Sequence, residues 1–206
     1  MAKKLLYQFD TDETASVFDS VVAYDGGADH VTGIGSVNPQ NVLAMVDGCI
    51  YTRAPKEKQC TAIFVGGSSL REGQAVFDAV QKRFFSNFRV SVMFDSNGSN
   101  TTAAAAVANI VSACGVSGKK AVILGGTGPV GQRAAALLSS ETADVFITSR
   151  NFQRAEQIAT EINDRFKTSV KALPGETIEE RKESISGASI VMATGASGVV
   201  LLNEKD

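Results

Sequence analysis

The chain has 206 residues, of which 44% are hydrophobic and 20% are charged, and its formal net charge is −2. This composition is ordinary for a folded globular protein, and the charge gives no reason to expect a nucleic acid or an anionic membrane as partner. The first apolar run, Leu5–Phe9, is far too short for a signal peptide or a membrane span, so we expect a cytoplasmic protein.

The first half of the chain alternates short apolar runs with helical patterns, which favours a parallel sheet with helices on its faces. The predicted elements are strand 4–9, helix 14–22, strand 30–34, helix 39–46, strand 60–65, helix 70–85, strand 88–94 and an alanine-rich helix 101–114. The pattern breaks at the two glycines of 115–118, which read equally well as a hinge or as an ordinary helix C-cap and loop. We place the domain boundary there, between domains 1–115 and 116–206.

The second half continues the alternation and predicts a Rossmann-type, doubly wound parallel sheet. Its elements are strand 120–124, helix 129–138, strand 143–148, helix 151–166, strand 169–172, helix 177–185 and strand 189–194. The last of these strands crosses to the other side of the switch point of such a sheet. Because a complete Rossmann sheet carries further strands, we expect this domain to be C-terminally incomplete, with Val191 on an exposed strand edge.

A glycine-rich turn joins the first strand and helix of this domain. Gly126, Gly128 and Gly131 suit a tight turn, a close approach to a pyrophosphate and close packing of the helix on the strand. Pro129 suits the first helical turn, and the free amides there favour a diphosphate. The alternative is a chance glycine turn, but the strand before it and the helix after it favour a cofactor site. Its predicted residues are Gly126, Thr127, Gly128, Pro129, Val130 and Gly131.

The end of the next strand predicts which nucleotide is bound. A protein that prefers NAD usually carries Asp or Glu about 20 residues after the turn, but this chain has Ser149 and Arg150 there, with Arg154 one helical turn further on. A guanidinium attracts a 2′-phosphate, so we expect NADP as the cofactor. The alternative is that Arg150 is only solvated. Thr194 ends the crossing strand and Gly195 follows it, and both are predicted to lie near the nicotinamide ring.

The sequence offers little for metal or acid–base chemistry. Cys49, Cys60 and Cys114 are scattered and His30 is the one histidine, so we predict no metal site and no catalytic acid or base. His30 lies in a glycine-rich turn, where a histidine is more often solvated than catalytic.

Several segments together resemble the methylene-tetrahydromethanopterin dehydrogenases of methylotrophic bacteria. These segments are Leu5–Asp12, Tyr24–His30, Lys56–Gln59, Thr61–Gly67, Asp95–Ala105 and Gly126–Gly131. The resemblance implies a cytosolic, homo-oligomeric enzyme of one-carbon oxidation. It would move hydride from the methylene group of the reduced pterin carrier to NADP and leave the methenyl form. The nitrogens beside the methylene carbon stabilise the resulting cation, so no protein base is required.

The resemblance also assigns domain 1–115 to the pterin and domain 116–206 to NADP. The pterin is expected at the loops that follow the strands of the first domain. The candidate residues are Asp10, Asp19, Asp95, Asn97, Asn100 and Thr102. Asp95 is the first choice for binding the pterin or stabilising the cation, and its alternative role is a helix N-cap. Lys56 and Lys58 are candidates for an acidic substrate tail or belong to a solvated loop.

The sequence is also compatible with two other functions. One is a dehydrogenase specific for methylene-tetrahydrofolate, which differs in the substrate tail. The other is a non-catalytic NADP-binding module or fragment. Turnover with both ligands present would exclude the second alternative.

Overall fold

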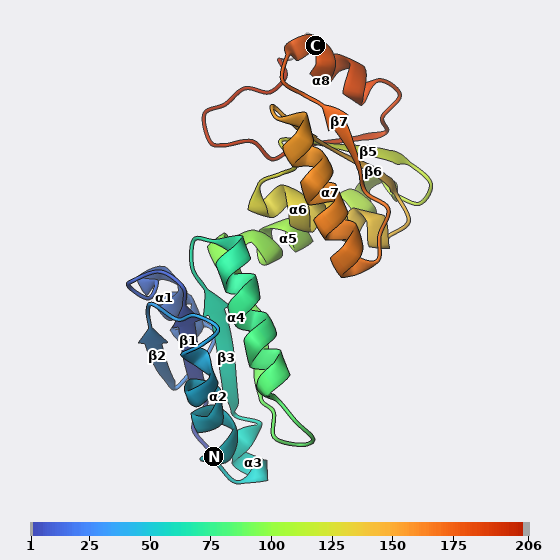
Figure 1. Cartoon of the computed structure of the whole chain (residues 1–206). Helices are drawn as coiled ribbons and strands as arrows, with labels where there is room; N and C mark the ends of the chain where they lie inside the picture. The colour runs from blue at the N-terminus through green and yellow to red at the C-terminus, as the bar shows by residue number, and fades with distance from the viewer. Residues whose placement is uncertain (1, 204–206) are drawn as a thin grey trace. The chain divides into compact units, whose positions relative to one another are not determined.

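Two parallel four-stranded sheets organise the chain, one in each of two units that divide between Gly98 and Ser99 (Figure 1). The structure, a computed structural model, describes residues 2–203. Each unit has its own hydrophobic core, and the alternation of strands and helices makes every strand pairing parallel. The α/β class with parallel sheets, predicted from the sequence, is confirmed.

The first unit, 1–98, has the strand order β2-β1-β3-β4. Its strands are β1 (Leu5–Asp10), β2 (His30–Ile34), β3 (Thr61–Gly66) and β4 (Ser91–Phe94). Its helices are α1 (Val17–Asp25), α2 (Val42–Tyr51), α3 (Pro55–Lys58), α4 (Leu70–Arg83) and the short 3₁₀ turn η1 (Ser96–Gly98). Strand order reverses between β1 and β3, and ligands of such sheets bind at the carboxyl ends of the strands beside this switch point.

One face of this sheet carries the core of the first unit. Phe9, Ile63 and Val65 alternate toward that face and are almost fully buried. Helices α2 and α4 lie side by side over it, and α4 contributes Val76 and Val80 from one helical face (Figure 1).

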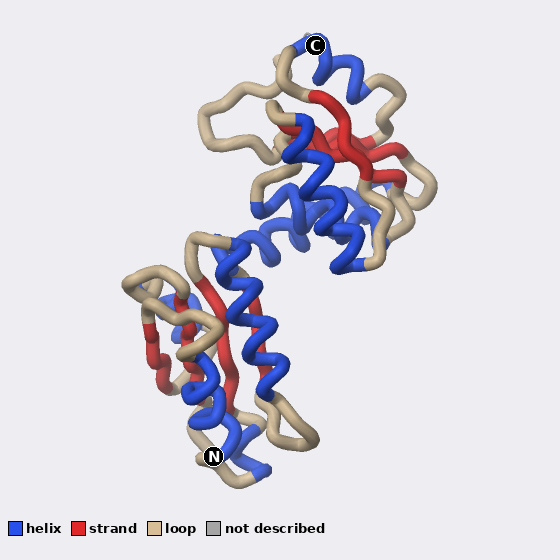
Figure 2. The backbone as a smooth tube through the Cα atoms, in the orientation of Figure 1, coloured by secondary structure: helices blue, strands red, loops and turns tan. Residues whose placement is uncertain are grey.

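The second unit, 99–206, has the strand order β7-β6-β5-β8. Its elements are α5 (Ser99–Cys114), β5 (Lys120–Leu124), α6 (Pro129–Ser140), β6 (Asp144–Ser149), α7 (Phe152–Phe166), β7 (Lys171–Pro174), α8 (Ile178–Ile185) and β8 (Ile190–Ala193). This order matches the first half of a Rossmann sheet plus the crossing strand, as predicted. Figure 2 shows strands of this unit in red with helices beside them in blue. The switch point lies between β5 and β8, beside the glycine turn.

The boundary between the units differs from the one placed at 115/116. Helix α5 belongs to the second unit, because Ala103 and Val107 are buried in that core and α5 packs against α6. Gly115 then ends α5 as an ordinary C-cap, with a positive φ of 61° and its N–H bonded to the carbonyl of Val111.

The predicted elements are present, with shifts of a few residues at their ends. Helix α3 and the turn η1 were not predicted, and β7 lies two residues later than expected. Among residues 2–203, no helix combines the length and the apolar character that a membrane span needs.

Candidate functional site

The glycine turn at the end of β5 is packed so tightly at Gly126 that no side chain fits at that position. A Cβ on Gly126 would stand 2.7 Å from the Cβ of Ile147 on β6. The N–H of Gly126 donates to the carbonyl of Thr148 (2.9 Å), which holds the turn against the end of β6. Gly125 has a positive φ of 69°, which suits glycine. This is a backbone turn of the kind that approaches a pyrophosphate closely.

Gly131 brings α6 against the turn. A Cβ on Gly131 would stand 2.7 Å from both the Cα of Gly126 and the Oγ1 of Thr194. The Thr194 hydroxyl is within hydrogen-bond distance of the carbonyls of Leu124 (3.1 Å) and Gly125 (3.2 Å). The side chain of Thr194 therefore ties the ends of β5 and β8 together.

The start of α6 is arranged to receive an anion. Gly128 is the N-cap and Pro129 the first helical residue, so no side chain claims the first amides of the helix. Gln132 donates from Nε2 to the carbonyl of Thr127 (2.8 Å) and fixes the turn from the helix side. The amides of Val130 and Gly131 and the positive end of the helix dipole favour a phosphate here.

The end of β6 carries the residues predicted to choose the nucleotide. Ser149 is half-buried, and its Oγ accepts the N–H of Asn151 (3.3 Å). Asn151 caps α7 by accepting the N–H of Arg154 (3.0 Å). The side chains of Arg150 and Arg154 are exposed, and among residues 2–203 neither has a salt-bridge partner. Both guanidinium groups are therefore available to a phosphate.

In the first unit, the carboxyl ends of the strands gather carboxylates. Asp10 ends β1 and is 1% exposed. Its Oδ1 accepts the N–H of Asp12 (3.0 Å) and its Oδ2 that of Ser16 (2.9 Å), so Asp10 organises the loop into α1. Asp12 in turn accepts the N–H and the hydroxyl of Ser68 (3.0 and 2.8 Å), which joins the loops after β1 and β3.

Asp19 reaches the same edge from the first turn of α1. A Cβ built on Gly66 would stand 3.5 Å from Oδ2 of Asp19 and 3.6 Å from Oδ2 of Asp10, so both carboxylates converge on that glycine. Burial raises the pKa of Asp19, and the charges of Asp10 and Asp95 raise it further, whereas a hydrogen bond with Ser16 opposes the shift. Three carboxyl groups, those of Asp10, Asp19 and Asp95, therefore lie near one another at this edge.

Asp95 and Asn97 follow β4 at this edge. Asp95 is 8% exposed, and its backbone N–H continues the sheet by donating to Val65 (3.0 Å). Asn97 adopts a left-handed conformation with a φ of 55° and donates its N–H to Gly67 (2.8 Å). The structure thus brings Asp10, Asp19, Asp95 and Asn97 to one edge. Asn100 and Thr102 lie on α5, in the second unit.

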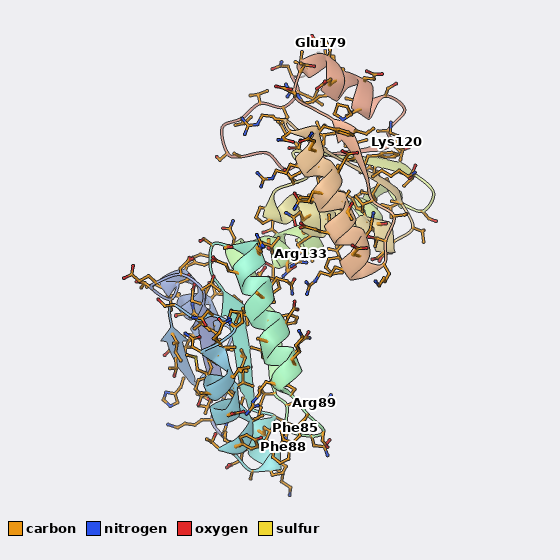
Figure 3. The ribbon with its side chains drawn as sticks, viewed as in Figure 1. Phe85, Phe88, Arg89, Lys120, Arg133 and Glu179 are labelled. Atoms are coloured by element: carbon orange, nitrogen blue, oxygen red, sulfur yellow. The ribbon has the colours of Figure 1, made fainter. Side chains whose placement is uncertain are left out.

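Other candidate residues lie at the opposite, amino end of this sheet. His30 begins β2, is exposed and lies 3.0 Å from the Nζ of Lys3. Lys58 lies just before β3, is 9% exposed and places its Nζ 4.5 Å from the centre of the Phe88 ring. Figure 3 shows Phe85 and Phe88 together there. Lys56 lies on the same short helix, α3. Within the described residues, no group of three potential metal ligands is present.

Two residues that support the glycine turn were missed in the sequence. The Oγ1 of Thr148 accepts the N–H of Gly125 (3.3 Å), and Gln132 binds the carbonyl of Thr127. Each is adjacent in sequence to a predicted site residue, Ser149 or Gly131, and that adjacency was the one signal available.

The second unit therefore defines a class: an α/β protein with the dinucleotide-binding turn of NAD(P)-dependent dehydrogenases. A family model described as "Methylene-tetrahydromethanopterin dehydrogenase, N-terminal" matches residues 17–97, and one described as "Shikimate / quinate 5-dehydrogenase" matches residues 106–206. Two proteins of Methylorubrum extorquens are similar over nearly the whole chain. The bifunctional protein MdtA is 59% identical over 204 residues, which are 98% of this chain and 71% of MdtA.

The second is an NAD(P)-dependent methylenetetrahydromethanopterin dehydrogenase, 30% identical over 213 residues, with 100% of this chain and 72% of that protein covered. The chain belongs to the methylene-tetrahydromethanopterin dehydrogenase family, as the sequence motifs predicted. A shikimate dehydrogenase crystallised with NADP⁺ has the same fold: the TM-score is 0.50 at 14% identity, covering 94% of this chain and 67% of that one.

Proposed function

We propose that the chain transfers hydride from the methylene group of methylene-tetrahydromethanopterin to NADP, giving the methenyl form of the carrier. The observation that carries the proposal is the glycine turn of β5 and α6 followed by Arg150, in a chain of this dehydrogenase family. We also propose that the protein works in the cytoplasm as a homo-oligomer, as the family resemblance implies.

The residues of the second unit fit NADP. No space for a Cβ is available at Gly126 and Gly131, so at these two positions the turn presents backbone rather than side chains. The amides at the start of α6 would hold the pyrophosphate, and Ser149, Arg150 and Arg154 would hold the 2′-phosphate. Thr194 would act through its ties to β5, and Gly195 would leave room beside the nicotinamide. NADP, when bound, supplies the hydride acceptor.

We assign the pterin to the carboxyl edge of the first unit. A carboxylate accepts two hydrogen bonds from the amino group and ring N–H of a pterin, and Asp95 is the candidate for this contact. Asn97 supplies an exposed amide beside it. Asn100 and Thr102, at the start of α5, are proposed as further contacts.

The chemistry asks for positioning and charge rather than for proton transfer. When the C–H bond breaks, hydride leaves with both electrons, and the resulting cation is shared by the methylene carbon and its two neighbouring nitrogens. No proton is removed, so the step needs no base. The negative charge at Asp10, Asp19 and Asp95 favours that cation over the neutral substrate. The protein's task is then to hold the methylene carbon about 3–3.5 Å from the carbon that accepts hydride.

The experiment is a comparison of initial rates of NADPH formation by the purified chain with methylene-tetrahydromethanopterin and with methylene-tetrahydrofolate. We expect a higher kcat/KM for the methanopterin carrier. Asp95→Asn should lower kcat while the Kd for NADP stays constant. Preference for the folate carrier would contradict the proposed substrate. NADP that binds but is not reduced with either carrier would identify a non-catalytic module.

A further inference from the structure

The β7–α8 turn is formed by Pro174, the last residue of β7, with Gly175 and Glu176, and side chains of α8 bind the carbonyl of each. The buried hydroxyl of Ser184 donates to the carbonyl of Pro174 (2.8 Å). Nη1 of Arg181 donates to the carbonyls of Gly175 (3.1 Å) and Glu176 (3.0 Å). The helix that follows the turn therefore fixes all of it (Figure 1).

The start of α8 is capped without these bonds from Arg181. Thr177 and Glu180 form a capping box, in which Oγ1 of Thr177 accepts the N–H of Glu180 (3.1 Å) and Oε2 of Glu180 accepts the N–H of Thr177 (3.1 Å). The Nε of Arg181 is buried, and within residues 2–203 it has no hydrogen-bond partner. Because a buried unsatisfied donor lowers stability, the stability of α8 alone does not explain an arginine at this position.

The other side of the β7–α8 turn packs against the end of β6. Pro174 is the register partner of Ser149, so the turn begins beside the last residue of β6. A Cβ built on Gly175 would stand 2.8 Å from the Cβ of Thr148 and 2.9 Å from its Oγ1. That same Oγ1 accepts the N–H of Gly125 (3.3 Å). The position of the β7–α8 turn is therefore coupled to the glycine turn that begins the nucleotide site.

The order of the strands puts this turn at the adenine end of the proposed NADP site. The pyrophosphate is assigned to the end of β5 and the 2′-phosphate to Ser149 and Arg150 at the end of β6, so the nucleotide runs along the carboxyl edge from β5 toward β6. Strand β7 is the next one in that direction, and neighbouring strands are about 4.8 Å apart. The adenine is attached to the ribose that carries the 2′-phosphate, and it therefore reaches the β7–α8 turn.

We propose that Arg181 is a positioning residue for NADP, which fixes the β7–α8 turn through the carbonyls of Gly175 and Glu176 as the surface against which the adenine lies. Ser184 supports the same turn through Pro174. A turn that is already fixed in the free protein loses less conformational entropy when the nucleotide binds, so the affinity is higher. The inference rests on the NADP site proposed above and adds residues that act on that site through the backbone.

Calorimetric titration and initial rates of α8 variants of the full chain test this role. Arg181→Met keeps the length of the side chain but removes its donors, and we expect it to raise both the Kd and the KM for NADP about 10-fold. The kcat should change by less than about twofold, because the nicotinamide end is unaffected. Arg181→Lys, whose ammonium group can donate to the same carbonyls, should restore most of the affinity. Lys182→Met is the matched control, because it removes the same charge from an exposed position one residue along α8.

A fragment of the cofactor locates the effect. The nucleotide 2′,5′-ADP lacks the nicotinamide half, and in Arg181→Met its Kd should rise by the same factor as the Kd for NADP. Ser184→Ala is a milder change that removes only the bond to Pro174, and we expect it to raise both Kd values about 3-fold. The binding stoichiometry should be the same in every variant. A purely structural role of Arg181 would instead lower the stoichiometry and leave the Kd of the folded molecules unchanged.

Three results would overturn the proposal alone. An unchanged Kd for NADP in Arg181→Met, with or without a reduced stoichiometry, would show that Arg181 serves stability only. A loss of NADP affinity that spares 2′,5′-ADP would remove the β7–α8 turn from the adenine site, and an equal loss in Lys182→Met would assign the effect to charge. An unsubstituted chain that does not bind NADP would contradict this proposal and the proposed function together. Binding without hydride transfer would contradict the proposed function alone, since every Kd is measured without the pterin.

Discussion

Arg150 stands where NAD-preferring proteins place a carboxylate, and its guanidinium is exposed at the end of β6. We predict that Arg150→Asp weakens NADP binding about 10- to 100-fold, since a charge-assisted hydrogen bond contributes about 1.5–3 kcal/mol. Binding of NAD should be spared or improved. Calorimetric titration with both nucleotides measures this, and Arg71→Asp, an exposed arginine of α4, makes the same charge change in the other unit. Equal losses for the two nucleotides would remove the proposed 2′-phosphate contact.

Asp19 has a raised pKa, mainly because it is partly buried and also because Asp10 and Asp95 are near. For a carboxyl group whose pKa is higher in the folded state, the contribution to stability is full at low pH and is lost as pH rises through the folded pKa. Asp19→Asn should therefore raise Tm at pH 7, and the gain should shrink as pH falls toward the ordinary value of 3.8. A gain that is the same at every pH would show that charge is not its cause.

Among the elements, the glycine turn uses one glycine for packing, Gly126, and another for the approach of the ligand, Gly128. A Cβ on Gly126 collides with Ile147, whereas the nearest atoms to a Cβ on Gly128 are 3.8 Å away. Gly126→Ala should lower the free energy of unfolding by about 1–3 kcal/mol through overpacking. Gly128→Ala should leave stability nearly unchanged but weaken NADP binding, because the methyl group stands where the pyrophosphate approaches. Urea unfolding and nucleotide titration of both variants distinguish these effects, and equal stabilities would contradict the account.

The strands and helices show which features of the fold could be predicted from the sequence. Apolar runs followed by glycine or Asp predicted the strands and the carboxyl edges, and hence the grouping of Asp10 with Asp95, because parallel strands end at one edge. The exposure of Val17, Phe18 and Val21 on α1 was not predicted. Periodicity locates an apolar stripe on a helix but does not show which side of the helix faces the sheet. The support from Thr148 and Gln132 depends on backbone geometry that no residue pattern marks.

For the whole molecule, the assignment of α5 decides which fragment folds. The residue pattern of an alanine-rich helix without charges does not indicate which core the helix joins. The predicted boundary at 115/116 therefore left this helix in the first unit. Its Ala103 and Val107 lie in the core of the second unit. We predict that fragment 99–206 gives a cooperative unfolding transition and binds NADP, whereas fragment 116–206, which exposes the face of α6, aggregates or unfolds. Equal stability of the two fragments, measured by circular dichroism, would argue against the boundary at 98/99.

Isotopic labelling of the substrate follows the hydride itself. Methylene-tetrahydromethanopterin deuterated at the methylene carbon is incubated with the purified chain and NADP, and the nicotinamide product is analysed by mass spectrometry. We expect NADPH that carries one deuterium from the methylene group, because the hydride moves directly between the two ligands. NADP that binds but is not reduced, or NADPH formed without deuterium, would contradict it.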